Sequence, residues 1–262
     1  MQERNRDTNP DSHRDRHWTL RSACAAMLVT LVGVASAWAQ APALAPKAWT
    51  GTVSAGINLT QGNTDTLNYN LAFDVLHPFS TRNVIKTTGL YLRGTQNDTL
   101  NVNRTSVGIR DEITISGRTF FFGKLDYLRD TFKAIDYLVA PGAGLGFKAV
   151  DSDRTKYTVD AAVGAVTEKN PLRDRRTSGA ITLGEKLTHQ LTSTASIKHE
   201  ATALWKTQDL DDALYTLSAG ISAALSGRAQ LSFEVLNVYK NRPPGVTKKN
   251  DVALITALTT KF

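Results

Sequence analysis

The last twelve residues of the chain alternate between two kinds of side chain at every position. From Asp251 to Phe262, the even-numbered positions hold Val, Leu, Thr, Leu, Thr and Phe, and the odd-numbered positions hold Asp, Ala, Ile, Ala, Thr and Lys. A period of two indicates a β-strand, whose successive side chains point to opposite faces. Soluble sheets usually have strands of about five or six residues, whereas strands that cross a membrane in a barrel are longer. The segment is therefore predicted to be a membrane strand, with an ordinary half-buried final strand as the alternative.

The same alternation recurs along the chain and gives most segments one apolar and one polar face. It predicts strands over residues 49–60, 67–75, 83–94, 101–115, 119–130, 135–148, 157–165, 175–186, 195–205, 213–225, 231–239 and 251–262. An even number of strands returns both ends of a barrel to the same side of the membrane. We therefore predict an all-β fold, an antiparallel transmembrane β-barrel of about twelve strands over residues 49–262. A soluble periplasmic β-protein is the architectural alternative.

The composition agrees with a barrel although it resembles that of a soluble protein. Hydrophobic residues make up 41% of the chain, and the mean hydropathy is −0.24. Every second residue of a barrel strand faces a polar lumen, so no long apolar run is needed. The net charge of +7 comes from basic residues mixed with acidic ones, without a nucleic-acid-binding motif. Nucleic acid is therefore not a predicted partner.

The first residues have the order of a secretory signal peptide. Five arginines within residues 1–21 precede the apolar run Ser22–Ala35, and the small-x-small site Ala37–Ala39 follows. We predict a signal peptide over residues 1–39 and a short periplasmic linker over residues 40–48. The apolar run is too short for a membrane anchor. The only cysteine, Cys24, lies within this run, so no disulfide, thiol nucleophile or Cys-based metal site is expected afterwards.

Leu254, Leu258 and Phe262 share the face of the last strand that we expect to meet lipid. Aromatic residues gather where a barrel wall meets the membrane interface. This pattern is similar to the C-terminal signal by which bacterial outer-membrane barrels are recognised for assembly. The expected location is therefore the bacterial outer membrane. The expected partners are its lipid and lipopolysaccharide and the barrel-assembly machinery.

The connections between the predicted strands also differ in character between the two ends. Those that would face the periplasm are short, whereas longer charged loops are expected around residues 168–176, 207–212 and 240–250. Aromatic girdles are expected at both ends, with residues 120–122, all phenylalanines, in the periplasmic one. Two charges, Asp111 and Arg129, fall on the lipid-facing parity. We expect a β-bulge near Asp111 and a position at the outer rim for Arg129.

The polar parity sends many charges of both signs into the lumen. The residues that we expect to line a pore are Arg104, Arg110, Glu112, Lys124, Asp126, Asp160, Lys198, Glu200 and Glu234. Unpaired buried charges are costly, so these groups are expected to pair across the interior. An interior filled by ion pairs and water is one reading, and a narrow polar pore for a small solute is the other. Gly142, Gly144 and Gly146 share this parity and leave room for a bend, for large side chains opposite, or for a solute path.

An enzyme is the alternative from a different functional class. Some outer-membrane barrels are lipid hydrolases whose Ser and His stand on the outer wall. Here His199 lies on that parity, with Ser193 and Ser196 nearby in sequence, but no GxSxG context surrounds them. The acidic residues Asp209, Asp211 and Asp212 offer oxygen ligands for Ca²⁺, although a solvated charged loop is the simpler reading. No catalytic residue, metal site or cofactor is predicted.

Three segments resemble one known family. They are W-T-G-T-V-S-A-G-I-N-L-T-Q-G-N-T-D-T-L-N-Y from Trp49, Y-L-R-D-T-F with A-P-G-A-G-L-G-F in the centre, and the terminal strand. They are similar to the salt-induced outer-membrane proteins, domain-of-unknown-function family 481, over residues 49–262. The resemblance implies an outer-membrane barrel without an established activity, in a structural or envelope-stress role, and it supplies no catalytic residues.

Overall fold

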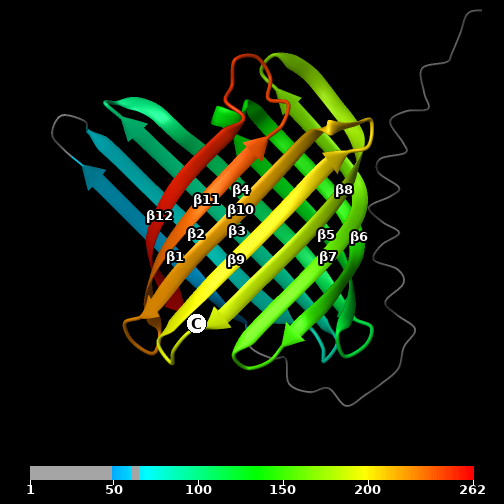
Figure 1. Ribbon diagram of the computed structural model, residues 1–262, viewed down its shortest axis with the longest axis vertical. Helices are drawn as coiled ribbons and strands as arrows, with labels where there is room; N and C mark the ends of the chain where they lie inside the picture. The colour runs from blue at the N-terminus through cyan, green and yellow to red at the C-terminus, as the bar shows by residue number, and fades with distance from the viewer. Residues whose placement is uncertain (1–48, 61–64) are drawn as a thin grey trace, which may run out of the picture. The chain divides into compact units, whose positions relative to one another are not determined.

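The computed structural model describes residues 49–60 and 65–262, which form a closed barrel of twelve antiparallel strands (Figure 1). The predicted fold class is therefore confirmed. The predicted signal peptide and linker lie outside the described residues. None of the described helices is long and apolar enough to cross a membrane. The strands are β1 (Thr50–Thr60), β2 (Thr66–Pro78), β3 (Asn83–Gln96), β4 (Thr99–Thr114), β5 (Thr119–Asp130), β6 (Ile135–Asp151), β7 (Thr155–Asn170), β8 (Arg173–Gln190), β9 (Ala195–Lys206), β10 (Asp209–Ala224), β11 (Ala229–Lys240) and β12 (Asn250–Lys261), with a short 3-10 helix η1 (Thr131–Lys133).

Each strand pairs with its neighbours in sequence, and β1 pairs with β12 to close the barrel. Val53 lies opposite Thr260, and the backbones of Gly51 and Phe262 exchange two hydrogen bonds of 3.1 and 3.2 Å. A closed sheet leaves no strand edge with unpaired backbone groups. We call the end where β12 finishes the C-terminal end, and the opposite end, which carries the loop over residues 241–249, the loop end.

The connections differ from the sequence prediction. Two of the long loops expected at the loop end are two-residue turns, since β7 reaches Asn170 before β8 starts at Arg173, and β9 reaches Lys206 before β10 starts at Asp209. Their polar residues belong to strand pairs whose ladder continues past a register shift, between Glu168 and Asn170 in one pair and between Asp209 and Ala213 in the other. A ladder of backbone bonds satisfies these polar segments as well as water does, so polarity alone does not indicate a loop.

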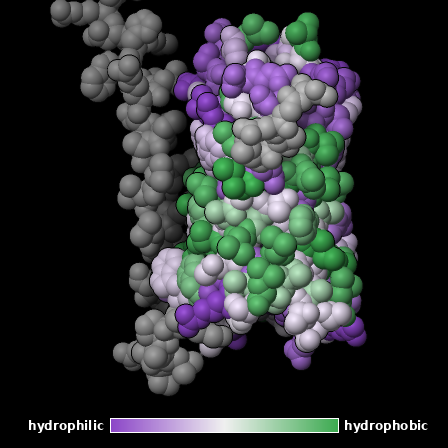
Figure 2. Space-filling model, turned by 90° about the vertical axis from the view of Figure 1, so that its left-hand side faces the viewer, coloured by the Kyte–Doolittle hydropathy of each residue, from purple (hydrophilic) through white to green (hydrophobic). Residues whose placement is uncertain are grey.

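The outer wall is apolar, as the alternation predicts. Large side chains such as Ile57, Leu71, Val163 and Leu254 are exposed on it. Figure 2 shows this apolar band on one face, with hydrophilic residues gathered toward the loop end. Leu258 and Phe262, the other predicted members of the assembly signal, are exposed as well.

The predictions for the two charged residues on the lipid-facing parity differ in their outcome. Arg129 is exposed and precedes the last residue of β5, in agreement with a rim position. The bulge expected near Asp111 is wrong, because the residue pairs in regular register with Ile85 and Gly123. Asp111 lies close to the end of β4, where the strand reaches the edge of the apolar band. Its half-buried side chain can therefore avoid the band without a local distortion of the ladder.

The largest buried side chains lie inside the barrel. Phe120 and Phe122 point inward and are almost fully buried, so their predicted place in the periplasmic aromatic girdle is wrong, whereas Phe121 between them is exposed. A Cβ at Gly146 would overlap the Phe120 ring, and a Cβ at Gly144 would overlap the backbone carbonyl of Ala161. The glycines of β6 therefore make room for a large ring and for the close approach of β7.

Candidate functional site: the lumen

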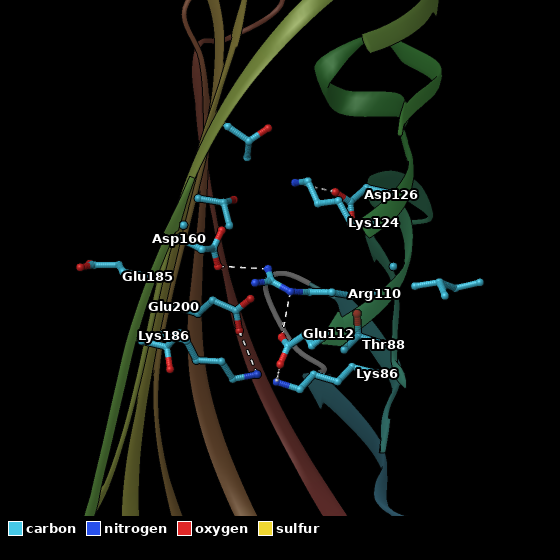
Figure 3. A pocket seen from close by; sticks show the side chains of 16 residues that line it. Lys86, Thr88, Arg110, Glu112, Lys124, Asp126, Asp160, Glu185, Lys186 and Glu200 are labelled. Atoms are coloured by element: carbon cyan, nitrogen blue, oxygen red, sulfur yellow. Dashed lines mark hydrogen bonds and ion pairs between the residues drawn. The ribbon is translucent and has the colours of Figure 1, made fainter. Parts of the chain in front are cut away.

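A chain of ion pairs centred on Arg110 spans the lumen. Its guanidinium Nη1 lies 3.0 Å from Asp160 on β7, and its Nε lies 2.9 Å from Glu112 on the same strand. The Glu112 carboxylate also lies 2.7 Å from the ammonium of Lys86 on β3. The guanidinium carbon lies 3.5 Å from the centroid of the Phe122 ring, which is a close cation–π contact. Figure 3 shows Arg110, Glu112 and Lys86 extending from one wall toward Asp160 on the opposite wall.

Further pairs occupy the same interior. The Lys124 ammonium lies 3.0 Å from the carboxylate of Asp126, two residues further along β5. Lys186 on β8 lies 3.6 Å from Glu200 and 3.8 Å from Asp74, so it links β8 to β9 and reaches across to β2. Because these groups are half-exposed to the lumen, each pair contributes less than about 1 kcal/mol to stability. Together these ion pairs fix the positions of the charged groups along the interior.

Three cavities lie among these groups and share lining residues. Their volumes are about 200, 300 and 90 Å³. The first two share Thr88, Lys186 and Glu200, and the last two share Lys198 and Glu234. Hydroxyl groups of Ser and Thr make up much of the remaining lining. We call this linked polar space the chamber, and it extends from the middle of the barrel toward the C-terminal end.

The chamber ends against apolar side chains on the side of the loop end. Two buried clusters face the lumen there, and both include Leu214 on β10. They line the inside of the wall from β3 to β12, and we call them the apolar belt. Its members are Leu90, Leu92, Val102, Leu128, Ile135, Leu138, Ala140, Val166, Ala180, Leu204, Leu214, Leu236, Val238, Ala253 and Ile255.

A small cavity of about 50 Å³ lies within the belt, on the loop-end side of the chamber, and Leu92, Val102 and Val238 are among its lining residues. It shares Arg104 and Leu236 with the 300 Å³ cavity of the chamber. Arg104 is buried, and its Nη1 lies 2.8 Å from Asp130. We call the place where Arg104 and Leu236 separate the two cavities the constriction.

Buried charges line the loop end. The Glu168 carboxylate lies 2.7 Å from the Lys206 ammonium and is also paired with Lys240, and all three side chains are nearly inaccessible. Lys133 of η1 is fully buried, and its ammonium donates to the backbone carbonyls of Lys248 and Lys249 at 3.0 and 2.8 Å. The 241–249 loop is therefore tied to η1 across the mouth.

The structure places every predicted pore-lining residue on the lumen side, in five different settings. Arg110, Glu112 and Asp160 belong to the central chain of ion pairs, Arg104 stands at the constriction, and Lys124 pairs with Asp126. Glu200 joins Lys186, whereas Lys198 and Glu234 take part in no ion pair among the described residues. Sequence reasoning missed the apolar belt and Lys133. Leucines on the polar parity near the strand ends, such as Leu92, Leu128, Leu204 and Leu236, were the available signal for the belt.

A polar cluster on the outer wall includes the enzyme candidate His199. Its Nε2 lies 2.9 Å from the Glu185 carboxylate, which also accepts a hydrogen bond of 2.8 Å from the hydroxyl of Tyr157. Ser196 points into the lumen and bonds Ser222 on β10. Ser196 is therefore on the opposite side of the wall from His199, and Ser193 lies in the turn between β8 and β9.

The three acidic residues considered for Ca²⁺ are held by basic side chains. Arg242 bonds Asp209 and Asp211, and Lys206 lies 2.6 Å from Asp212. Within the described residues, no group of three or more His, Cys, Asp or Glu side chains is placed to hold a metal ion.

Comparisons with solved structures agree with the fold. The chain is similar to the NanC porin, with a TM-score of 0.50 and 8% identity over 81% of this chain and 98% of that one. It is also similar to the COG4313 outer-membrane channel from Pseudomonas putida F1, with a TM-score of 0.48 and 11% identity over 84% of this chain and 97% of that one. These identities show a shared fold alone.

No curated protein matches the sequence. The family model described as protein of unknown function, DUF481, matches residues 53–262, which is nearly the whole described barrel. The chain therefore belongs to the DUF481 family.

Proposed function

We propose that the protein is a narrow outer-membrane pore for small polar solutes. The observation that carries this proposal is the chamber, whose three cavities share lining residues and are separated from a fourth cavity only by the constriction. Polar groups line the interior of barrels that hold water. The similarity to the NanC porin supports the outer membrane as the location.

The interior also suggests which solutes pass. Arg104 and Leu236 leave little space between the chamber and the small cavity, so large hydrophilic molecules are excluded. Positive and negative side chains alternate around the chamber instead of gathering on opposite walls. A lumen of one sign concentrates counter-ions, so this mixture predicts weak selectivity between anions and cations.

Conductance in a planar bilayer tests the pore. The refolded protein, without residues 1–39, is inserted and recorded in KCl, and the reversal potential is measured in a salt gradient. Small, reproducible steps with weak ion selectivity are expected. A silent bilayer from protein that shows heat-modifiable migration on a denaturing gel would mean that the apolar belt plugs the barrel.

The role in the envelope is part of the same proposal. The exposed terminal strand supports insertion by the barrel-assembly machinery. The family resemblance supports contacts with lipopolysaccharide at the outer leaflet and a response to salt or envelope stress. Comparing outer-membrane fractions of cells grown in low and high salt tests the stress response. Equal amounts of the protein in both conditions would contradict it.

A lipid-modifying enzyme is the second candidate, and one observation favours it. Glu185 orients His199 on the outer wall, and a carboxylate–histidine pair is a general-base unit. However, the nearest outward-facing hydroxyl in this cluster belongs to Tyr157, which donates to Glu185. Incubation with phospholipid vesicles, followed by fatty-acid release, tests this function. Release by the parent protein that is lost in His199→Ala would support it, and no release from the parent would exclude it.

A further inference from the structure

Two opposite charges in the chamber take part in no ion pair among the described residues. Lys198 on β9 and Glu234 on β11 both line the 300 and the 90 Å³ cavities. The other lumen-facing charged side chains of the chamber are paired, including Lys186 with Glu200 at 3.6 Å. Glu234 accepts one hydrogen bond, 2.7 Å from the hydroxyl of Ser218, and meets no cation.

The register sets these two charges on either side of one glycine. Gly220 on β10 pairs with Lys198 on one side and with Glu234 on the other. All three residues point into the lumen, and the two charged residues are separated by two strand spacings, or about 10 Å between backbones. A Cβ at Gly220 would lie 3.3 Å from the Cβ of Glu234. Because the glycine has no side chain, the space between the ammonium and the carboxylate stays open.

Hydroxyl groups surround this gap. Ser54, Ser222, Ser232 and Thr259 line the same 90 Å³ cavity as Lys198 and Glu234. Ser54 and Thr259 already bond one another at 2.8 Å, and Ser232 bonds the carbonyl of Ala257 at 3.2 Å. These groups form a polar floor and leave the two unpaired charges as the strongest interactions available to a solute.

We propose that Lys198 and Glu234 form a binding site for a small zwitterion, with its anionic group on Lys198 and its ammonium on Glu234. A ligand with one charge satisfies only one of the two groups, whereas a zwitterion satisfies both. Hydrogen bonds to charged groups are stronger than neutral ones. The inference rests on the proposed pore, since a pore brings the solute to this point, and it names the solute class.

Three probes of equal chain length separate the charges: 4-aminobutyrate, butyrate and butylamine. Saturation-transfer difference NMR with the refolded protein in detergent micelles measures a Kd for each. We expect 4-aminobutyrate to bind about tenfold more tightly than either single-charge probe. Lys198→Met and Glu234→Gln should each remove that advantage, and Lys169→Met on the outer wall should keep it. Equal Kd values for the three probes would overturn the proposal.

A charge exchange distinguishes a binding site from an effect on folding. In the double variant Lys198→Glu with Glu234→Lys, a zwitterion binds in the reverse orientation, so the affinity for 4-aminobutyrate should return to within about threefold of the parent. If the exchanged protein does not fold, the Lys198→Met variant alone tests the site. It should lower the affinity for butyrate and leave the affinity for butylamine unchanged. An equal loss of affinity for butyrate and for butylamine would contradict the site.

The outcomes for the site and for the pore are separable. Zwitterion preference in micelles together with a silent bilayer would support the site and reject the pore. Conductance without any preference among the three probes would support the pore and reject the site.

Discussion

The ammonium of Lys133 lies 2.9 Å from the carboxylate of Asp251, at the start of β12. The two residues are far apart in sequence, and Lys133 is fully buried although it belongs to a short connection between strands. The same ammonium holds two carbonyls of the 241–249 loop. The last loop of the barrel is thus fastened to η1 by a single side chain.

Lys133→Met is expected to release this loop. A hydrogen bond to a charged group contributes about 1.5 to 3 kcal/mol, so loss of these bonds should raise the population of open loop at least about tenfold. Limited trypsin digestion of the folded barrel, read on a boiled gel, should show faster cleavage after Lys248 and Lys249. Lys156→Met, which removes an exposed lysine at the C-terminal end, is the matched control. Equal cleavage rates in the two variants would show that Lys133 does not hold the loop.

Leu236→Ala is expected to widen the constriction. Leu236 is buried and faces the lumen between the chamber and the small cavity. Truncation should raise the single-channel conductance and lower the free energy of unfolding by about 2 kcal/mol. Val235→Ala is the control, because Val235 is the neighbouring residue and faces outward. A conductance that rises equally in both variants, or in neither, would place the resistance elsewhere.

Arg110 and Asp160 are expected to be energetically coupled across the lumen. Their 3.0 Å contact is partly shielded from solvent, so its coupling energy should lie between those of surface and buried pairs, at about 1 to 3 kcal/mol. A double-mutant cycle with Arg110→Met and Asp160→Asn, followed by urea unfolding in detergent, measures this energy. The exposed Arg129→Met serves as the control partner for Asp160→Asn. Additive effects of Arg110→Met and Asp160→Asn would mean that water already screens the pair.

Leu258→Asp and deletion of Phe262 are expected to slow insertion into lipid vesicles. Leu258 lies on the outer wall opposite Ala55, and Phe262 bonds Gly51 where the barrel closes. A carboxylate on a lipid-facing wall is destabilising, by less than roughly 2 kcal/mol. Val246→Asp makes a similar change at a fully exposed side chain of the 241–249 loop, and this variant should insert normally. Heat-modifiable migration over time measures the folded fraction, and insertion at the parent rate would contradict the role of the terminal strand.

Several features of the barrel could be predicted from the sequence because they depend only on the parity of a strand. The existence of the twelve strands and the lumen-facing side of Arg110, Lys198 and Glu234 are of this kind. Parity says which face a residue is on, and the chemistry of lipid and water decides which face is outside. The terminal strand, with Leu254 and Leu258 outward, follows in the same way.

Contacts across the lumen could not be predicted, because they depend on the stagger between strands and on barrel curvature. That stagger brings Asp160 to Arg110, Lys186 to Asp74 and Lys133 to Asp251. It also brings inward leucines of many strands to one level, where they form the apolar belt. Strand alternation by itself thus determined the barrel and the direction of its side chains. Only closure of the sheet decided which side chains meet, since every such contact joins residues that are distant along the chain.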